Sequence, residues 1–128
     1  MVNKKANTIR PASWNESSLS QHEILLVAPA EIAAYLDDHA DLATVVPSVC
    51  AQARRDFGKD AELALSVYHD PEIDDHYLKL NVRLPVYDEA FAAQLDRVSE
   101  PFDAELSSAS GYFLVTTDLQ TAQAKHVI

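Results

Sequence analysis

The chain has 128 residues and a formal net charge of −10. This length suits one domain with a hydrophobic core, and a hydrophobic fraction of 48% is normal for a globular protein. The negative charge repels phosphate backbones, so we expect no nucleic-acid partner. The apolar runs are too short to span a bilayer, and no secretory signal follows the first cations. We therefore expect no membrane partner and a cytoplasmic location.

The composition also excludes several chemistries. The single cysteine, Cys50, allows neither an internal disulfide nor a zinc site built from cysteines. Its place on an apolar helical stripe favours a buried, unreactive thiol. The two glycines, Gly58 and Gly111, are too few for a P-loop or a dinucleotide fingerprint. No Gly-x-Ser-x-Gly motif is present, and nothing in the spacing of serines and histidines points to a catalytic triad. We expect no cofactor and no catalytic residue.

The first expected elements lie before residue 60. Residues 1–20 are polar and aperiodic, which predicts a mobile arm. A short apolar strand is expected over Glu23–Ala28, and Pro29 is well placed to begin a helix that ends near Asp38. After a polar break, apolar residues at helical spacing predict a second helical piece that Gly58 ends. These residues are Val46, Val49, Cys50, Ala53 and Phe57.

Alternating apolar residues then predict a β-hairpin. The apolar positions are Leu63, Leu65 and Val67 in the first strand, and Leu78, Leu80, Val82 and Leu84 in the second. The octapeptide His69–His76 is expected to be the exposed loop between them. If the apolar side chains face the helices, the alternate residues of the second strand face away from them. Those residues are Tyr77, Lys79, Asn81 and Arg83.

Beyond the hairpin, the pattern predicts one helix and one strand. Asp88 suits a helix N-cap, and an apolar stripe follows over Phe91–Leu106. Pro101 interrupts this stripe, so we expect the helix to kink or split near Arg97. Residues 112–117 are rich in β-branched and aromatic side chains, which predicts the last strand. Residues 121–128 are expected to be a short tail.

The expected order of elements is therefore β-α-β-β-α-β, with the first helix in two pieces. This order predicts an α+β fold, a ferredoxin-like sandwich over residues 21–120. In that fold an antiparallel sheet carries both helices on one face. The other face is open to water or to a partner.

The acidic loop is the first place that could carry function. Its candidate metal ligands are His69, Asp70, Glu72, Asp74, Asp75 and His76. Carboxylates suit calcium or magnesium, and imidazoles suit a transition metal. The loop nevertheless lacks the glycine and the terminal glutamate of an EF-hand, and a hairpin tip surrounds an ion poorly. A charged loop that meets water or a partner is favoured, with metal binding as the alternative.

The open sheet face is the second place. Its expected interaction residues are Tyr68, Tyr77, Lys79, Asn81 and Arg83. Aromatic rings beside cations resemble an RNA-binding sheet in outline, but the signature of that module is missing and the chain is acidic. Two interpretations stay open. The cations pair with acidic neighbours on a wet face, or the face is an interface with a second copy or another protein.

Two motifs resemble those of a group of small, uncharacterised bacterial proteins. One is the acidic turn Asp70–Asp75 (DPEIDD), and the other is the strand Ser110–Asp118 (SGYFLVTTD). The resemblance covers about residues 45–119, and it implies a bacterial protein without implying catalytic residues.

From these observations the sequence favours a non-catalytic protein-interaction module, which forms a homodimer, binds a basic partner, or does both. The alternative is an enzyme, or a metal or small-ligand binder, that uses the His69–His76 loop.

Overall fold

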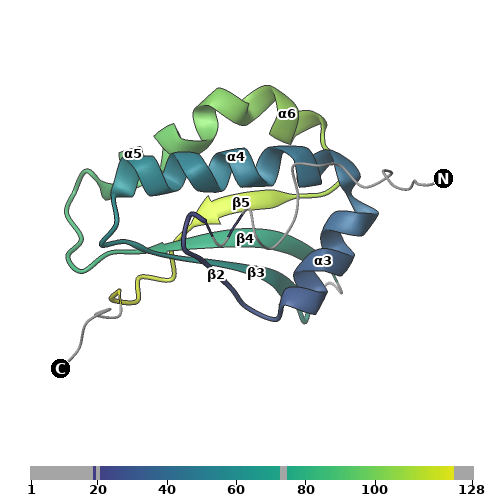
Figure 1. Cartoon of the computed structure of the whole chain (residues 1–128), viewed down its shortest axis with the longest axis horizontal. Helices are drawn as coiled ribbons and strands as arrows, with labels where there is room; N and C mark the ends of the chain where they lie inside the picture. Colours follow the sequence, from purple (N-terminus) through teal and green to yellow (C-terminus); the bar gives the residue numbers. More distant parts are fainter. Residues whose placement is uncertain (1–18, 20, 73–74, 123–128) are drawn as a thin grey trace.

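The computed structural model describes residues 19, 21–72 and 75–122. The elements are β2 (Ile24–Leu26), α3 (Pro29–Asp38), α4 (Ala40–Phe57), β3 (Glu62–Asp70), β4 (Asp75–Arg83), α5 (Phe91–Ser99), the 3-10 turn η1 (Glu100–Phe102), α6 (Asp103–Ser108) and β5 (Phe113–Thr116). The fold is α+β, and the helices pack against one face of a four-stranded sheet (Figure 1). The expected arm lies outside the described residues except for Leu19, which is fully buried, and so does the expected tail except for residues 121 and 122.

The sheet corrects the predicted topology. The strand order is β2-β3-β4-β5, with β2 parallel to β3, β3 antiparallel to β4, and β4 parallel to β5. The sheet is therefore mixed, and the prediction of an antiparallel ferredoxin-like sheet is wrong. In a ferredoxin-like sheet each β-α-β crossover skips one strand, whereas here each crossover returns to the adjacent strand. The order of elements along the chain allows both arrangements, because it does not specify which strand a crossover reaches.

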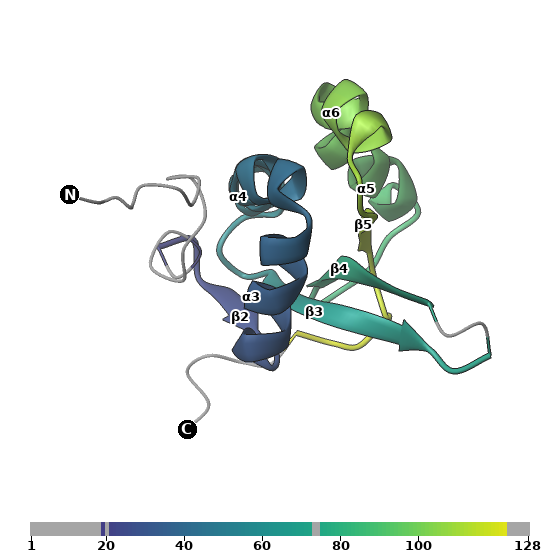
Figure 2. The same ribbon diagram turned by 90° about the vertical axis from the view of Figure 1, so that its right-hand side faces the viewer.

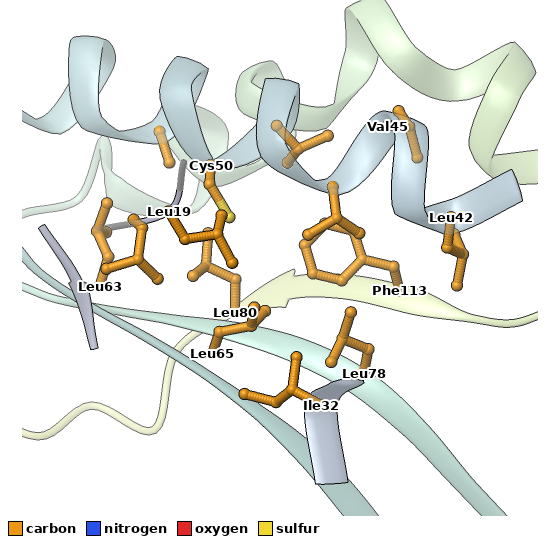
Figure 3. Close-up of a cluster of buried hydrophobic side chains, with 14 of the residues drawn as sticks. Leu19, Ile32, Leu42, Val45, Cys50, Leu63, Leu65, Leu78, Leu80 and Phe113 are labelled. Atoms are coloured by element: carbon orange, nitrogen blue, oxygen red, sulfur yellow. The ribbon is translucent and has the colours of Figure 1, made fainter. Parts of the chain in front are cut away.

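The hydrophobic core lies between the sheet and the helices (Figure 3). The inward residues of β3 and β4 are fully buried, as their alternation predicts: Leu63, Leu65, Leu78, Leu80 and Val82. Figure 3 shows that Ile32 and Leu42 extend from the helices toward these strand residues. Each such side chain contributes about 1.5–3 kcal/mol by leaving water. Cys50 belongs to this core, and burial raises the pKa of its thiol to about 12, so the thiol stays protonated at neutral pH.

Two prolines lie where a helix begins or breaks. Pro29 is the first residue of α3. A backbone N–H at this position has no acceptor within the helix, so the lack of one in proline costs no helical hydrogen bond. Pro101 lies in η1 between α5 and α6, so the predicted split of this helix is confirmed. After the split, α6 continues over the core and leads the chain back to β5.

The two strands of the hairpin are longer, and the loop between them is shorter, than the sequence predicts. His69 pairs with His76 and Asp70 pairs with Asp75, so these four residues of the expected loop belong to the strands. Only residues 71–74 connect them, and of these 73 and 74 lie outside the described residues. Because successive strand residues alternate between faces, both histidines lie on the helix side and both aspartates lie on the open side.

One end of the open sheet face is covered by the chain that follows β5, which crosses the sheet on the side away from α4 and α5 (Figure 2). Asp118 accepts a hydrogen bond from the Arg83 guanidinium at 2.9 Å, and the Ala122 N–H donates to the Leu84 carbonyl at 3.2 Å. Beneath this segment Asn81 is only 6% exposed. Among the described residues no donor reaches its Oδ1.

The residue before α3 generates a stability prediction. Ala28 has φ 55° and ψ 69°, a left-handed conformation that strains any residue with a Cβ atom. We expect Ala28→Gly to raise the free energy of unfolding by about 0.5 kcal/mol, because relief of strain exceeds the entropic cost of glycine. Ala34→Gly, the same change within α3, should lower it by about 1 kcal/mol. Urea denaturation of both variants checks this, and equal destabilisation would contradict it.

Candidate functional site

Three tyrosines cross the open face of the sheet, and we call Tyr68, Tyr77 and Tyr112 the tyrosine row. Tyr68 of β3 lies directly opposite Tyr77 of β4, with ring centroids 5.2 Å apart. Tyr112 immediately precedes β5, and its ring meets that of Tyr77 edge-on at 5.3 Å. The outer two rings are 37% and 56% exposed. The three strands therefore present a continuous aromatic surface to water.

The tyrosine row already holds one cation. The Lys79 Nζ lies 4.7 Å from the centroid of the Tyr68 ring, within the range of a cation–π interaction. Burial raises the pKa of Tyr77, and the neighbouring Tyr68, Tyr112 and Asp70 raise it further. The Tyr77 hydroxyl therefore stays protonated at neutral pH, and the ring faces keep the negative potential that attracts cations.

The residues of the predicted interaction face separate into two groups. Tyr68, Tyr77 and Lys79 lie together in the exposed part. Asn81 is buried beneath the segment that follows β5. Arg83 is 3.6 Å from Glu62 and 2.9 Å from Asp118, and its hydrogen bond to Asp118 raises the pKa of the guanidinium. Asn81 and Arg83 thus lie at the covered end of this face.

Sequence reasoning missed Tyr112 as part of this surface. The pattern of residues 112–117 predicts only that Tyr112 belongs to the last strand. Its neighbour Phe113 is buried in the core, so alternation places Tyr112 on the opposite face. This alternation can be read from the sequence. It places Tyr112 beside Tyr77 only because β5 pairs with β4, and the sequence does not show that pairing.

The predicted metal ligands are distributed over both sides of the hairpin. His69 and His76 point to the helix side, whereas Asp70 and Asp75 lie on the open side. The Asp70 Oδ1 accepts a hydrogen bond from the Glu72 N–H, and the Asp75 Oδ1 accepts one from the His76 N–H. Asp74 lies outside the described residues. Within the described ranges, no group of three or more histidine, cysteine, aspartate or glutamate side chains is placed to hold a metal ion.

On the helix side, three histidines and one tyrosine form a second aromatic series, which we call the histidine row: His69, His76, Tyr35 and His39. The rings of His69 and His76 stack at 5.4 Å, and His76 meets Tyr35 edge-on at 5.6 Å. Tyr35 lies 4.4 Å from His39. A shallow pocket of about 180 Å³ adjoins the row, lined by Glu31, Ala34, Tyr35, Asp38, Val67, His69 and His76.

Tyr35 connects the histidine row to the tyrosine row. Its hydroxyl accepts a hydrogen bond from the Tyr112 N–H at 2.9 Å and donates to the Tyr112 carbonyl at 3.3 Å. Gly111 makes this approach feasible, because a Cβ there would lie 2.8 Å from both the Tyr35 hydroxyl and the His39 Cγ. The position of Tyr112 on the open face therefore depends on packing on the helix side.

Ser110 lies within hydrogen-bond distance of both His39 and Asp41, an arrangement that no local sequence pattern predicts. The Ser110 N–H donates to Asp41 at 2.7 Å and its hydroxyl at 3.0 Å, and the His39 Nδ1 is 3.0 Å from that hydroxyl. The bonds from Ser110, the backbone N–H first, lower the pKa of Asp41.

This arrangement lacks the geometry of a catalytic triad. In a triad the serine proton goes to histidine and the carboxylate orients the imidazole. Here the ionised Asp41 can only accept, so the Ser110 hydroxyl donates its hydrogen bond to Asp41, and the His39 Nδ1–H donates to the serine oxygen. The three residues tie the start of α4 to the loop before β5.

Comparisons with known proteins do not assign this chain to a family: no family model, no curated protein and no solved structure matches it. No helix among the described residues is long and apolar enough to cross a membrane. The two aromatic rows are therefore the features from which function has to be inferred.

The crowding at Gly111 predicts a specific coupling. Gly111→Ala should lower the free energy of unfolding by about 1–3 kcal/mol, because the new methyl group displaces His39 or Tyr35. In a His39→Ala background the same change should cost clearly less. Gly58→Ala is the control, because its φ of 81° strains alanine while nothing lies within 4 Å of the added atom. Chemical denaturation should show coupling to His39 for Gly111 alone; equal coupling at Gly58 would contradict the steric explanation.

The lowered pKa of Asp41 predicts a pH dependence. A carboxyl group with a folded pKa below its ordinary 3.8 stabilises the fold above that value, and this contribution disappears as the pH falls through the folded pKa. Asp41→Asn should lower the free energy of unfolding by about 1 kcal/mol at pH 7, since the group is exposed to solvent. The difference should shrink below pH 4. Asp96→Asn on α5 serves as the control in pH-dependent denaturation, and a difference that is constant with pH would refute the assignment.

Proposed function

We propose that this chain is a non-catalytic protein-interaction module that binds another protein through the tyrosine row. The observation that carries this proposal is the exposed aromatic surface on the sheet face that no described helix covers. Tyrosine is enriched at protein interfaces, because it offers a large contact area and a polar hydroxyl at a low cost in side-chain entropy. A cytoplasmic, bacterial setting is part of the same proposal.

The surroundings of the tyrosine row support an interface. Leu25 of β2 pairs with Ala64 and shares the open face, where it is 49% exposed. Val27 follows two residues later and is 45% exposed. Exposed apolar side chains on the same face as exposed aromatic rings add apolar surface that a partner can cover. The tyrosines stand on paired strands with a fixed register, so binding requires little ordering of the backbone.

Two kinds of partner fit this surface. One is a second copy of the chain, which would give a homodimer, and the other is a basic protein. Each copy carries a net charge of −10, so two copies repel one another at long range, whereas a basic protein is attracted. Charge therefore favours the basic partner.

The alternative function, an enzyme or ligand binder that uses the hairpin, has less support. The imidazoles of His69 and His76 lie on the opposite side of the sheet from the carboxylates of Asp70 and Asp75, so these four groups do not converge on one substrate. The pocket beside the histidine row measures about 180 Å³, which is smaller than the roughly 300–1,000 Å³ of ordinary small-molecule sites.

Differential capture tests the proposal. We expect the double variant Tyr68→Ser/Tyr112→Ser to lose proteins that the wild-type chain retains from a lysate of its source organism, because the outer rings of the row are removed. Val86→Ser is the matched control, since Val86 is 78% exposed and lies outside the row. Mass spectrometry identifies the retained proteins, and light scattering measures the mass of the chain alone.

Folding of both variants is verified by thermal denaturation. Identical capture by the wild-type chain and the tyrosine variant, with unchanged mass in light scattering, would overturn the proposal.

A further inference from the structure

We infer that the partner presents a cationic segment, and that an arginine of this segment lies on the tyrosine row and pairs with Asp70 and Asp75. The inference rests on the proposed function and deepens it by naming the chemistry of the partner. It follows from three features: the pair of carboxylates on the open face, the Lys79 cation that the tyrosine row already contacts, and the net charge of the whole chain.

The two carboxylates stand at the hairpin end of the tyrosine row. Asp70 lies directly opposite Asp75, one register step beyond the His69–His76 pair and two beyond Tyr68–Tyr77. Like charges at directly opposite positions destabilise a sheet. In the part of the chain that the structure describes, each carboxylate accepts a local backbone hydrogen bond and neither forms an ion pair. A cation placed between them would relieve this repulsion.

The rings beside these carboxylates suit a flat cation. Lys79 over the Tyr68 ring shows that a cation is accommodated on this face. The exposed Tyr112 ring offers a further face next to Tyr77. A guanidinium group stacks on an aromatic ring and donates paired hydrogen bonds to carboxylates, which an ammonium group cannot do in the same geometry. Arginine is therefore favoured over lysine as the anchoring residue.

The charge of the chain favours the same partner. A net charge of −10 attracts a basic segment and accelerates encounter, in a way that salt weakens. A second copy would bring another Asp70–Asp75 pair to a face-to-face contact, and its single Lys79 balances only one of these two carboxylates. Self-association through this face therefore adds repulsion where a cationic segment adds attraction.

Peptide binding to the full chain tests the inference. The probe is a short peptide of alternating arginine and serine, and the matched control replaces each arginine with citrulline, which has the same shape without the charge. In calorimetry we expect the citrulline peptide to bind at least about tenfold more weakly. Asp70→Asn/Asp75→Asn should weaken the arginine peptide by a similar factor. Asp103→Asn/Glu105→Gln removes the same charge from α6 and should change its affinity by less than about twofold.

Lys79 gives a test whose sign distinguishes partners. Lys79→Gln removes a competing cation from the row, so it should strengthen binding of the arginine peptide. It would weaken binding of an acidic segment. Weaker binding of the arginine peptide to this variant would overturn the inference.

The remaining outcomes separate this inference from the proposed function. Equal weakening by the α6 double variant would show diffuse attraction to an acidic protein, and the inference falls. If the tyrosine variant loses captured proteins but the wild-type chain binds no arginine peptide, the interaction surface stands and the cationic partner is refuted. If neither capture nor peptide binding depends on the tyrosine row, both fall.

Discussion

Parallel pairing at both edges of the central hairpin is the constraint on which the rest of this structure depends. A parallel neighbour can be reached only by a crossover, and the crossovers here are α3 with α4 and α5 with α6. Both pack on the same side of β3 and β4, so within the described residues the other side receives no helix (Figure 2). Arg54 holds the short β2 edge in place, because its guanidinium donates to the carbonyls of His22 and Glu23 at one end and of Gly58 and Ala61 at the other.

The two-residue period of the strands then sorts chemistry between the two faces. Near the hairpin tip, adjacent residues of the acidic segment lie on opposite faces of the sheet. His69 and His76 face α3, whereas Asp70 and Asp75 face water. A ligand set that looks dense in the sequence is thereby divided into two sites of different character. Tyr35 is the contact between them, since its hydroxyl bonds both main-chain polar groups of Tyr112.

The sequence predicted what periodicity controls and missed what long-range packing controls. The inward residues of the hairpin, the helix break at Pro101 and the orientation of Tyr77 and Lys79 all follow from local spacing. The strand order does not, because the same chain of elements fits crossovers to an adjacent or a more distant strand. The contact of His39 with Ser110 joins positions 71 residues apart, and no local pattern reports such a meeting.

The segment after β5 explains why the exposed chemistry concentrates at one end of the open face. Among the described residues, Arg83 forms ion pairs there with Glu62 and Asp118, so this cluster keeps one net negative charge, and Asn81 is removed from water. Interactions between paired charges cancel at a distance, whereas two adjacent carboxylates add their fields. The charged groups of the covered end already bond to one another, so they are less able to pair with a binding partner. The tip, where Asp70 and Asp75 border three tyrosine rings, combines an attractive potential with an aromatic contact surface on a rigid pair of strands.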